Sequence, residues 1–296
     1  MAAVFPNWVD LPKEVTTKIL RKVGAVDVLK SAQFVCTHWY SISLDPLLWR
    51  TIHVTHKSNN FDVITTAISR SCGQLEDITI VYPIESLLHH IANSGSNLRH
   101  LRLQCCSRSL SISNHELKEC AKKLPLLEGL DLSNAGLSKD CVETIGQSCP
   151  LLKDLKFIKK RKYIIKGFIE CDDDAFAIAK TMQNLRHLTL LGNWITNAGL
   201  LSILNGCPHL ESLDLRGCLN LNLQDTSLKK ACAAAQIKQL RPPHEYLAES
   251  SDDEFDISDS FTINSFLLDA IVQAHDLDLR NSFDLMESDP SDFFFE

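Results

Sequence analysis

Long apolar runs are missing from this chain of 296 residues. No stretch approaches the roughly eighteen uninterrupted apolar residues of a membrane-spanning helix, so the sequence predicts no membrane span. The N-terminus, MAAVFPNWVDLPKE, lacks the basic region and apolar core of a secretory signal. We therefore expect the protein in the nucleus, the cytoplasm or both. Because disulfides are rare there, the 11 cysteines do not indicate a disulfide framework.

Basic residues are almost absent from the C-terminal part of the chain. Residues 245–296 contain 15 Asp and Glu against one basic residue, Arg280, which gives a net charge of −14. Residues 1–244 contain 29 Lys and Arg against 22 Asp and Glu, which gives +7. The overall charge of −7 therefore combines a mildly basic body with a strongly acidic tail.

A six-residue pattern, apolar-x-x-apolar-x-apolar, recurs through the middle of the sequence. It occurs as WRTIHV, LEDITI, LRHLRL, LEGLDL, LKDLKF, LRHLTL and LESLDL, beginning at residues 49, 75, 98, 127, 152, 185 and 210. Helical patterns such as LSKDCVETIGQSCP lie between these hexads. One strand and one helix in about 25 residues indicate a leucine-rich-repeat solenoid. We predict an α/β fold in which about seven repeats, residues 49–235, place parallel strands on a curved concave face and helices outside.

Cysteines recur at the helix ends of these repeats, at Cys72, Cys149 and Cys207. We expect them to fill small apolar sites rather than to act as thiolates. These units resemble the cysteine-containing subtype of leucine-rich repeat.

A catalytic thiol is the weakest interpretation of the sequence. Cys105 and Cys106 lie between His100 and His115, but no third group that could orient a histidine is evident. The sequence predicts no catalytic residue, no metal site and no cofactor.

Alternation along each strand predicts which side chains face outward on the concave side. The position between the second and third apolar residues gives a central row: His53, Thr79, Arg102, Asp131, Lys156, Thr189 and Asp214. The position two residues earlier gives a flanking row: Thr51, Asp77, His100, Gly129, Asp154, His187 and Ser212. Parallel strands lie about 4.8 Å apart, so Arg102, Asp131 and Lys156 should be neighbours of alternating sign.

Two interpretations of these rows stay open. Such a mixed polar face suits a protein ligand, because concave solenoid faces commonly dock partners. Alternatively, the charges only neutralise one another on a solvated sheet. The candidate substrate-binding residues are His53, Asp77, Thr79, His100, Arg102, Asp131, Asp154, Lys156, His187, Thr189 and Asp214.

One interval between hexads is 33 residues long and contains a basic run, Lys159 to Lys162. This run fits a nuclear-localisation signal, a nucleic-acid patch or a solvated loop beside Asp172–Asp174. Tyr163 and Phe168 are too few aromatic residues to indicate single-strand binding, so nucleic acid is not an expected partner.

Residues 8–50 have a pattern of their own, which predicts three short helices. Pro12 suits the start of the first helix, Gly24 its end, and Asp27 can cap the second helix. Cys36 and Trp39 recur at helical spacing with Val35 and Ile42, which predicts a common apolar face. No second cysteine or histidine pair lies near Cys36 to complete a zinc site, so we interpret Cys36 as a packing residue.

The same stretch resembles the F-box motif between Trp8 and Trp49. The matching elements are Leu-Pro with Glu two residues later, Ile-Leu, Asp-Val-Leu, Val-Cys-x-x-Trp and Asp-Pro-x-x-Trp. Val26 before Asp27 departs from the proline that is frequent there. With the cysteine-containing repeats, the sequence resembles an F-box/leucine-rich-repeat protein, most like the short plant members of that group.

This resemblance implies a non-catalytic substrate receptor of a Skp–cullin–F-box ubiquitin ligase. The residues implied to contact the Skp-type adaptor, or to pack beneath that contact, are Leu11, Pro12, Ile19, Leu20, Val28, Leu29, Val35, Cys36 and Trp39. The repeats would then hold an unknown protein substrate, and a small-molecule co-ligand stays open. The alternative is a repeat scaffold or inhibitor outside any ligase.

We expect residues 236–296 to form an acidic, largely disordered tail. FTINSFLLDAIVQAH has the apolar spacing of a short helix near 265–275. Two roles stay open for this helix: a cap on the last repeat, or a segment that folds on a partner. A third possibility is that the acidic tail folds back on the basic body and competes with substrate.

Overall fold

The computed structural model describes residues 11–54, 61–81, 85–104, 112–133, 137–158, 171–235 and 237–243. The chain divides into two compact units, Met1–Tyr246 and Leu247–Glu296, and the second lies wholly outside the described residues. The predictions for the acidic tail beyond residue 243, and for the basic run at 159–162, therefore fall outside the described residues.

Eight parallel strands form one sheet in which strand order follows chain order. The strands are β1 (Thr51–Val54), β2 (Asp77–Val81), β3 (His100–Gln104), β4 (Gly129–Ser133), β5 (Asp154–Ile158), β6 (His187–Thr189), β7 (Ser212–Asp214) and β8 (Gln239–Arg241).

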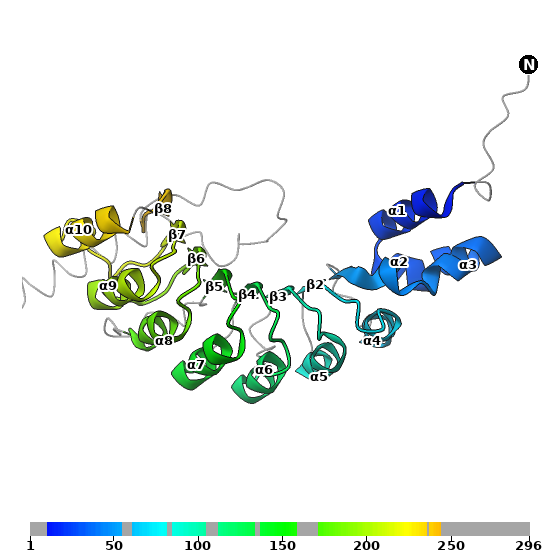
Figure 1. The fold of residues 1–296 in the computed structure, drawn as a ribbon, viewed down its shortest axis with the longest axis horizontal. Helices are drawn as coiled ribbons and strands as arrows, with labels where there is room; N and C mark the ends of the chain where they lie inside the picture. Colours follow the sequence, from blue (N-terminus) through cyan, green and yellow to red (C-terminus); the bar gives the residue numbers. More distant parts are fainter. Residues whose placement is uncertain are drawn as a thin grey trace, which may run out of the picture. The chain divides into compact units, whose positions relative to one another are not determined.

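A helix precedes each strand from β2 to β8. These helices are α4 (Phe61–Arg70), α5 (Glu85–Ser94), α6 (Asn114–Ala121), α7 (Lys139–Ser148), α8 (Asp173–Thr181), α9 (Asn197–Gly206) and α10 (Thr226–Ala234). Figure 1 shows the strands along the inner side of the curve and the helices along its outer side, as predicted for a solenoid.

The hexads form the core of the solenoid. All three apolar positions of each of the seven hexads are buried, from Trp49, Ile52 and Val54 to Leu210, Leu213 and Leu215. The helices supply the opposite wall with residues such as Ile145 and Ile203. No repeat can bury these side chains alone, so stacking of neighbouring repeats stabilises the fold.

The sheet continues one strand beyond the predicted end of the repeats at residue 235. Strand β8 pairs with β7, and Leu240 is the register partner of Leu213. The sequence IKQLRP (237–242) keeps the first two apolar positions of the hexad but has Pro242 at the third. Because of that proline and the shortness of the strand, the hexad pattern does not predict this eighth strand.

The recurring cysteines do not all behave as predicted. Cys149 and Cys207 are buried, and their thiols lie 3.8 Å from the Ala121 carbonyl and 3.5 Å from the Met182 carbonyl of the preceding repeat. Cys72 is exposed and has a positive φ of 47°. It ends its helix in a left-handed turn rather than filling an apolar site, so that part of the prediction is wrong.

The N-terminal helical unit, residues 11–50, contains the three predicted helices: α1 (Lys13–Val23), α2 (Ala25–Lys30) and α3 (Thr37–Ser43). Two 3₁₀ turns, η2 (Ala32–Phe34) and η3 (Pro46–Arg50), complete it. Gly24 separates α1 from α2 at a φ of 93°, which glycine adopts without strain. It precedes α2 directly, so the prediction that Asp27 caps this helix is wrong.

The expected helical stripe from Val35 to Ile42 is also wrong in part. Helix α3 begins at Thr37, and Cys36 precedes it with extended backbone. The Cys36 sulfur accepts a hydrogen bond from the Trp39 N–H at 3.5 Å, so this thiol caps α3. Within the described residues, no helix is long and apolar enough to cross a membrane.

Candidate protein-interaction surfaces

Exposed apolar side chains concentrate in the N-terminal helical unit. Of twelve large apolar side chains that are exposed in the described part of the chain, seven belong to this unit. They are Val15, Val23, Phe34, Val35, Tyr40, Leu44 and Leu47, and we refer to them as the apolar surface. The other five are distributed over the much longer repeat region. So many exposed apolar side chains in so short a unit make it a candidate interaction site.

The nine residues that sequence reasoning assigned to adaptor binding or its support divide into two groups. Leu20, Val28 and Leu29 are buried in a core that continues into the repeats. The other six retain exposed area: Leu11, Pro12, Ile19, Val35, Cys36 and Trp39. The first group can only support a contact, whereas the second is available to make one.

Six members of the apolar surface are absent from the nine predicted adaptor residues: Val15, Val23, Phe34, Tyr40, Leu44 and Leu47. Phe34 has 71% of its area exposed, more than any other large apolar side chain of the described chain. Tyr40, Leu44 and Leu47 recur at intervals of four and three residues, which is the spacing of one helix face. That spacing was visible in the sequence, but the apolar residues around Trp39 have helical spacing as well, and the sequence alone does not say which set is exposed.

Polar contacts hold α1 against the η3 turn beside the exposed leucines. Lys13 Nζ lies 2.7 Å from Asp45 Oδ2, and Arg21 Nη2 donates to the Leu47 carbonyl at 2.7 Å. The Leu47 N–H donates to Asp45 at 3.0 Å. Hydrogen bonds from Lys13 and from the Leu47 backbone lower the pKa of Asp45. These contacts fix the backbone that presents Leu47.

Arg70, at the end of α4, ties the N-terminal helical unit to the first repeat. Its Nη1 donates to Gln33 Oε1 at 3.0 Å and to the Ser43 carbonyl at 3.2 Å. The guanidinium lies 5.8 Å from the ring centre of buried Trp49, whose Nε1 donates to the Ser43 carbonyl at 2.9 Å. Helices α2 and α4 also contact each other. The unit and the solenoid therefore share one continuous core.

The concave rows lie where alternation places them. Arg102 is the register partner of Asp131, and Asp131 is the register partner of Lys156. The flanking row follows the same register, with Asp77 opposite His100 and Asp154 opposite His187. The sequence thus predicted which side chains share this face, while their role in substrate binding stays a prediction.

Ion pairs on this face join carboxylates to bases on neighbouring strands. Lys156 Nζ lies 3.4 Å from Asp131 Oδ2, as the predicted alternation suggests. Arg102 pairs instead with Asp77 in the flanking row, at 2.7 Å, because its long side chain reaches diagonally across the strands. Asp131 is only 8% exposed and also accepts from Ser133 Oγ at 3.0 Å.

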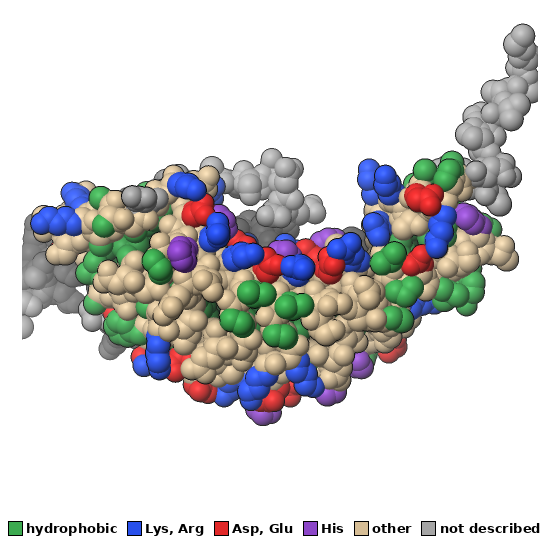
Figure 2. All heavy atoms as spheres, in the orientation of Figure 1, with side chains coloured by type: hydrophobic (Ala, Val, Ile, Leu, Met, Phe, Trp, Pro, Cys, Tyr) green, Lys and Arg blue, Asp and Glu red, His purple; other side chains and the backbone are tan. Residues whose placement is uncertain are grey.

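A third row of charges runs along the N-terminal ends of the strands, and we call it the edge row. It consists of Arg50, Glu76, Arg99, Glu128, Lys153, Arg186, Glu211 and Lys238. Each member after Arg50 donates its backbone N–H to the carbonyl of the preceding member at 2.7–2.9 Å. Red and blue side chains follow one another along the inner side of the arc in Figure 2.

Carboxylates in the edge row are shared between flanking cations. Glu128 binds Arg99 and Lys153, and Glu211 binds Arg186 at 3.0 Å and Lys238 at 2.7 Å. Hydrogen bonds from these cations lower the pKa of Glu128 and of Glu211, and Arg50 lowers the pKa of Glu76 in the same way. The carboxylates therefore stay ionised to a lower pH than an isolated glutamate would.

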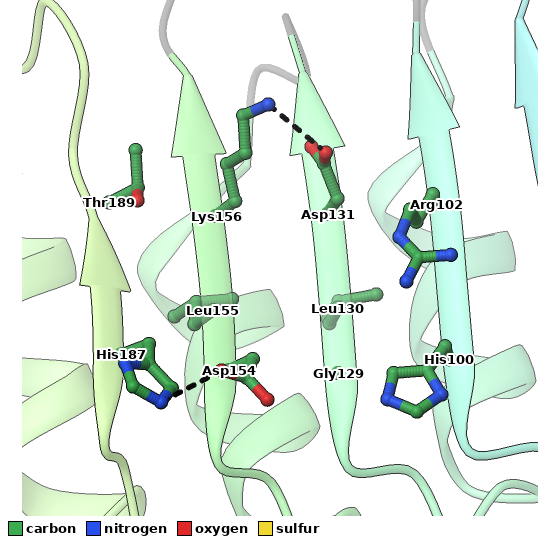
Figure 3. A pocket seen from close by; sticks show the side chains of 10 residues that line it. All are labelled: His100, Arg102, Gly129, Leu130, Asp131, Asp154, Leu155, Lys156, His187 and Thr189. Carbon is green, nitrogen blue, oxygen red and sulfur yellow. Dashed lines mark ion pairs between the residues drawn. The ribbon is translucent and has the colours of Figure 1, made fainter. Parts of the chain in front are cut away.

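A shallow hollow of about 290 Å³ opens on the concave face over Gly129. Glycine leaves a gap in the flanking row, and a Cβ there would approach His100 Cδ2 to 2.7 Å. Figure 3 shows His100 and Asp154 on either side of this gap, with Leu130 and Leu155 beside it. The hollow is open and polar at its rim, which suits an inserted side chain of a partner.

Three buried thiols of the repeats are unsuited to nucleophilic chemistry. Burial raises the pKa of Cys120, Cys149 and Cys207 to about 12, so these thiols stay protonated at neutral pH. Cys105 and Cys106 lie outside the described residues. In the described ranges, no three His, Cys, Asp or Glu side chains are grouped as a metal site would require.

The fold defines a class of protein, a leucine-rich-repeat solenoid that follows a helical unit with an exposed apolar surface. A family of sequences described as F-box-like matches residues 8–55. F-box/LRR-repeat protein 23 of Arabidopsis thaliana is 41% identical over 249 residues, which cover 81% of this chain and 54% of that protein.

Two further relatives match over more of their length. F-box protein SKIP19 of Arabidopsis thaliana is 40% identical over 86% of this chain and 84% of that protein. F-box/LRR-repeat protein 21 of the same plant is 38% identical over 82% of this chain and 84% of that protein. The chain spans about half the length of protein 23 but most of the other two. It belongs to the F-box/leucine-rich-repeat family.

Proposed function

We propose that this protein is the substrate-recognition subunit of a Skp–cullin–F-box ubiquitin ligase. F-box proteins are in general non-catalytic receptors that bind a Skp-type adaptor, and through it a cullin. In this chain the apolar surface would bind the adaptor, and the concave rows would bind a protein substrate. The observation that carries the proposal is the exposure of seven large apolar side chains within residues 15–47.

Physical chemistry supports this assignment of the apolar surface. Removing apolar area from water is favourable by about 25 cal/mol per Å², so a partner that covers these side chains gains free energy. The charged side chains of the concave face already pair with one another within the chain. They therefore suit the selection of a particular substrate better than they suit tight binding.

Continuity between the two regions supports a receptor role. Ubiquitin transfer would occur on other subunits, and this chain would contribute by holding the substrate near them. Such positioning requires that the adaptor-binding unit and the repeats move together. The contacts of Arg70 with Gln33, Ser43 and Trp49 connect them within one compact unit.

Co-purification with a Skp-type adaptor tests the proposal. The intact chain should retain the adaptor, and Phe34→Asp/Val35→Asp should lose it, because charged groups cannot replace two apolar contacts. The matched control is Leu126→Asp/Leu151→Asp, which changes two exposed apolar residues in the repeats. This control should bind the adaptor as the intact chain does.

Two results would count against the proposal. Equal loss in both double variants would mean that the apolar surface is not the adaptor site. Failure of the intact, folded chain to bind any Skp-type adaptor would leave a leucine-rich-repeat scaffold outside the ligase as the function.

A further inference from the structure

The charges on the inner face alternate in sign from strand to strand. Considering the edge, flanking and central positions, β2, β4 and β7 carry only carboxylates among their charged residues: Glu76 and Asp77, Glu128 and Asp131, Glu211 and Asp214. Strands β3 and β8 carry only Lys or Arg: Arg99 and Arg102, Lys238 and Arg241. Strand β1 carries Arg50.

The alternation breaks once in the described sheet, between β5 and β6. Strand β5 carries Lys153 and Lys156 against Asp154, and β6 carries Arg186. Two strands of positive balance are therefore neighbours. We call this place the β5–β6 step.

The arrangement of ion pairs leaves the step without a carboxylate in the edge row. Lys153 pairs with Glu128 on its β4 side at 2.6 Å, and Arg186 pairs with Glu211 on its β7 side at 3.0 Å. Their backbones are nevertheless adjacent, since the Arg186 N–H donates to the Lys153 carbonyl at 2.8 Å. Each cation thus shares its carboxylate with a second cation, Arg99 or Lys238.

Among the described residues, the ion pair that crosses the step lies in the flanking row. Asp154 Oδ1 is 3.7 Å from His187 Nε2, and Figure 3 shows this pair beside Lys156. About half of the side-chain area of Arg186 and of His187 is exposed. Lys153, Lys156 and Arg186 thus stand against a single carboxylate on these two strands, and their side chains are accessible.

We infer that the β5–β6 step binds an anionic group of the protein substrate, a carboxylate of an acidic segment. The inference rests on the proposed function and names the substrate chemistry for the concave face. A carboxylate placed between Lys153 and Arg186 restores the alternation of the edge row. It can accept a bidentate pair of hydrogen bonds from the guanidinium, while Lys153 acts as a point charge.

The surroundings of the step fit the same ligand. The hollow over Gly129 is lined by Asp154, Lys156 and His187, so an adjacent substrate side chain can enter it while the anion lies on the step. Positive charge on β5 itself, from Lys153 and Lys156, favours approach of an acidic chain.

The test measures binding of three short fluorescein-labelled peptides to the intact chain by fluorescence anisotropy. The first contains Glu, Gly and Ser, the second has Gln in place of Glu, and the third has phosphoserine in place of Glu. We expect the Glu peptide to bind, the Gln peptide not to bind, and added salt to weaken binding. Binding of the phosphoserine peptide alone would keep the step as an anion site and identify phosphate as the source.

Matched variants locate the site. Lys153→Gln/Arg186→Gln should weaken the Glu peptide roughly fivefold or more. The control Arg99→Gln/Lys238→Gln removes one cation from the same two carboxylates, Glu128 and Glu211, but leaves the step intact. It should bind the peptide as the intact chain does, and both double variants should bind the adaptor.

Three results would overturn the inference: equal weakening in both double variants, binding of the Gln peptide as tight as that of the Glu peptide, or binding of neither anionic peptide. Adaptor binding separates these results from failure of the proposed function. If the intact chain does not bind the adaptor, the proposed ligase function is wrong. If it binds the adaptor but does not distinguish the peptides, only the anion site is wrong.

Discussion

The N-terminal helical unit, residues 11–50 and hereafter the F-box unit, leaves seven large apolar side chains exposed, whereas the inner face of the repeats is lined by charged side chains that pair with one another. The F-box unit is too short to bury all of its apolar residues, so part of its surface needs a partner. The solenoid buries every hexad position and needs none for its core. The two regions therefore suit different tasks, since apolar area supplies affinity and fixed charges supply selectivity.

The largest expected effect comes from separating the two regions at their junction. Trp49 is 1% exposed, and Trp49→Ala should lower the free energy of unfolding by about 3–5 kcal/mol. The substitution removes a buried ring together with the hydrogen bond that Trp49 Nε1 donates to the Ser43 carbonyl. Denaturant unfolding measures the loss, and Trp49→Phe should cost less. Equal stability of Trp49→Ala and the intact chain would show that the regions do not share a core.

A smaller effect is expected from a buried charge of the concave face. Asp131→Asn should destabilise the chain by about 1–3 kcal/mol, because Lys156 and Ser133 lose an ionised partner in a nearly buried site. Asp154→Asn, at a half-exposed position on the adjacent strand, should change stability by less than about 0.5 kcal/mol. Thermal unfolding of both variants compares them directly, and equal effects would mean that burial of Asp131 is unimportant.

The edge row gives the stability of the repeats a small dependence on acid pH. The folded pKa values of Glu76, Glu128 and Glu211 lie below the ordinary value of 4.5. Their contribution to stability is therefore complete above about pH 4.5 and is lost as the pH falls through the lower folded values. All three are close to solvent, so the contribution is small and is screened by salt.

A matched variant tests that pH dependence. Replacing the three glutamates by glutamine should flatten the fall in stability below about pH 4.5, as measured by thermal unfolding across the acid range. An unchanged acid profile would show that the edge row does not contribute. Asp45→Asn is the corresponding variant in the F-box unit, because hydrogen bonds from Lys13 and from the Leu47 backbone lower the pKa of this one carboxyl group.

The smallest effect on stability is expected at the apolar surface itself. Phe34 and Val35 are 71% and 65% exposed, so Phe34→Asp/Val35→Asp should alter the free energy of unfolding by no more than about 0.5 kcal/mol. Denaturant unfolding of the free chain checks this value. A loss comparable to that of Trp49→Ala would mean that these side chains support the fold rather than await a partner.

The repeat architecture was predictable because leucine alternation determines which face of a strand is buried. Residues such as Arg102, Asp131 and Lys156 could be placed in one row for that reason. The diagonal pairing of Arg102 with Asp77 was not predictable, since it depends on the reach of a flexible side chain. The eighth strand was missed because Pro242 interrupts its hexad.

The F-box unit was harder to predict in detail. Its helices carry apolar residues on more than one face, and the packing of α1 against α2 and α3 and of α2 against α4 decides which face is covered. Leu20 and Leu29 became core, whereas Phe34 and Leu47 stayed exposed. The start of α3 at Thr37 moved Cys36 from the expected stripe to a cap. The alternation of charge from strand to strand can be read in the sequence, but the strand register is needed to show which charged side chains are neighbours.

The most direct measurement compares two double variants against two ligands. Phe34→Asp/Val35→Asp and Lys153→Gln/Arg186→Gln are each titrated with a Skp-type adaptor and with the Glu peptide. If the two surfaces act independently, the first variant loses the adaptor and keeps the peptide, and the second binds the peptide more weakly and keeps the adaptor. Loss of both ligands in either folded variant, or of neither in both, would contradict the division of labour between the F-box unit and the repeats.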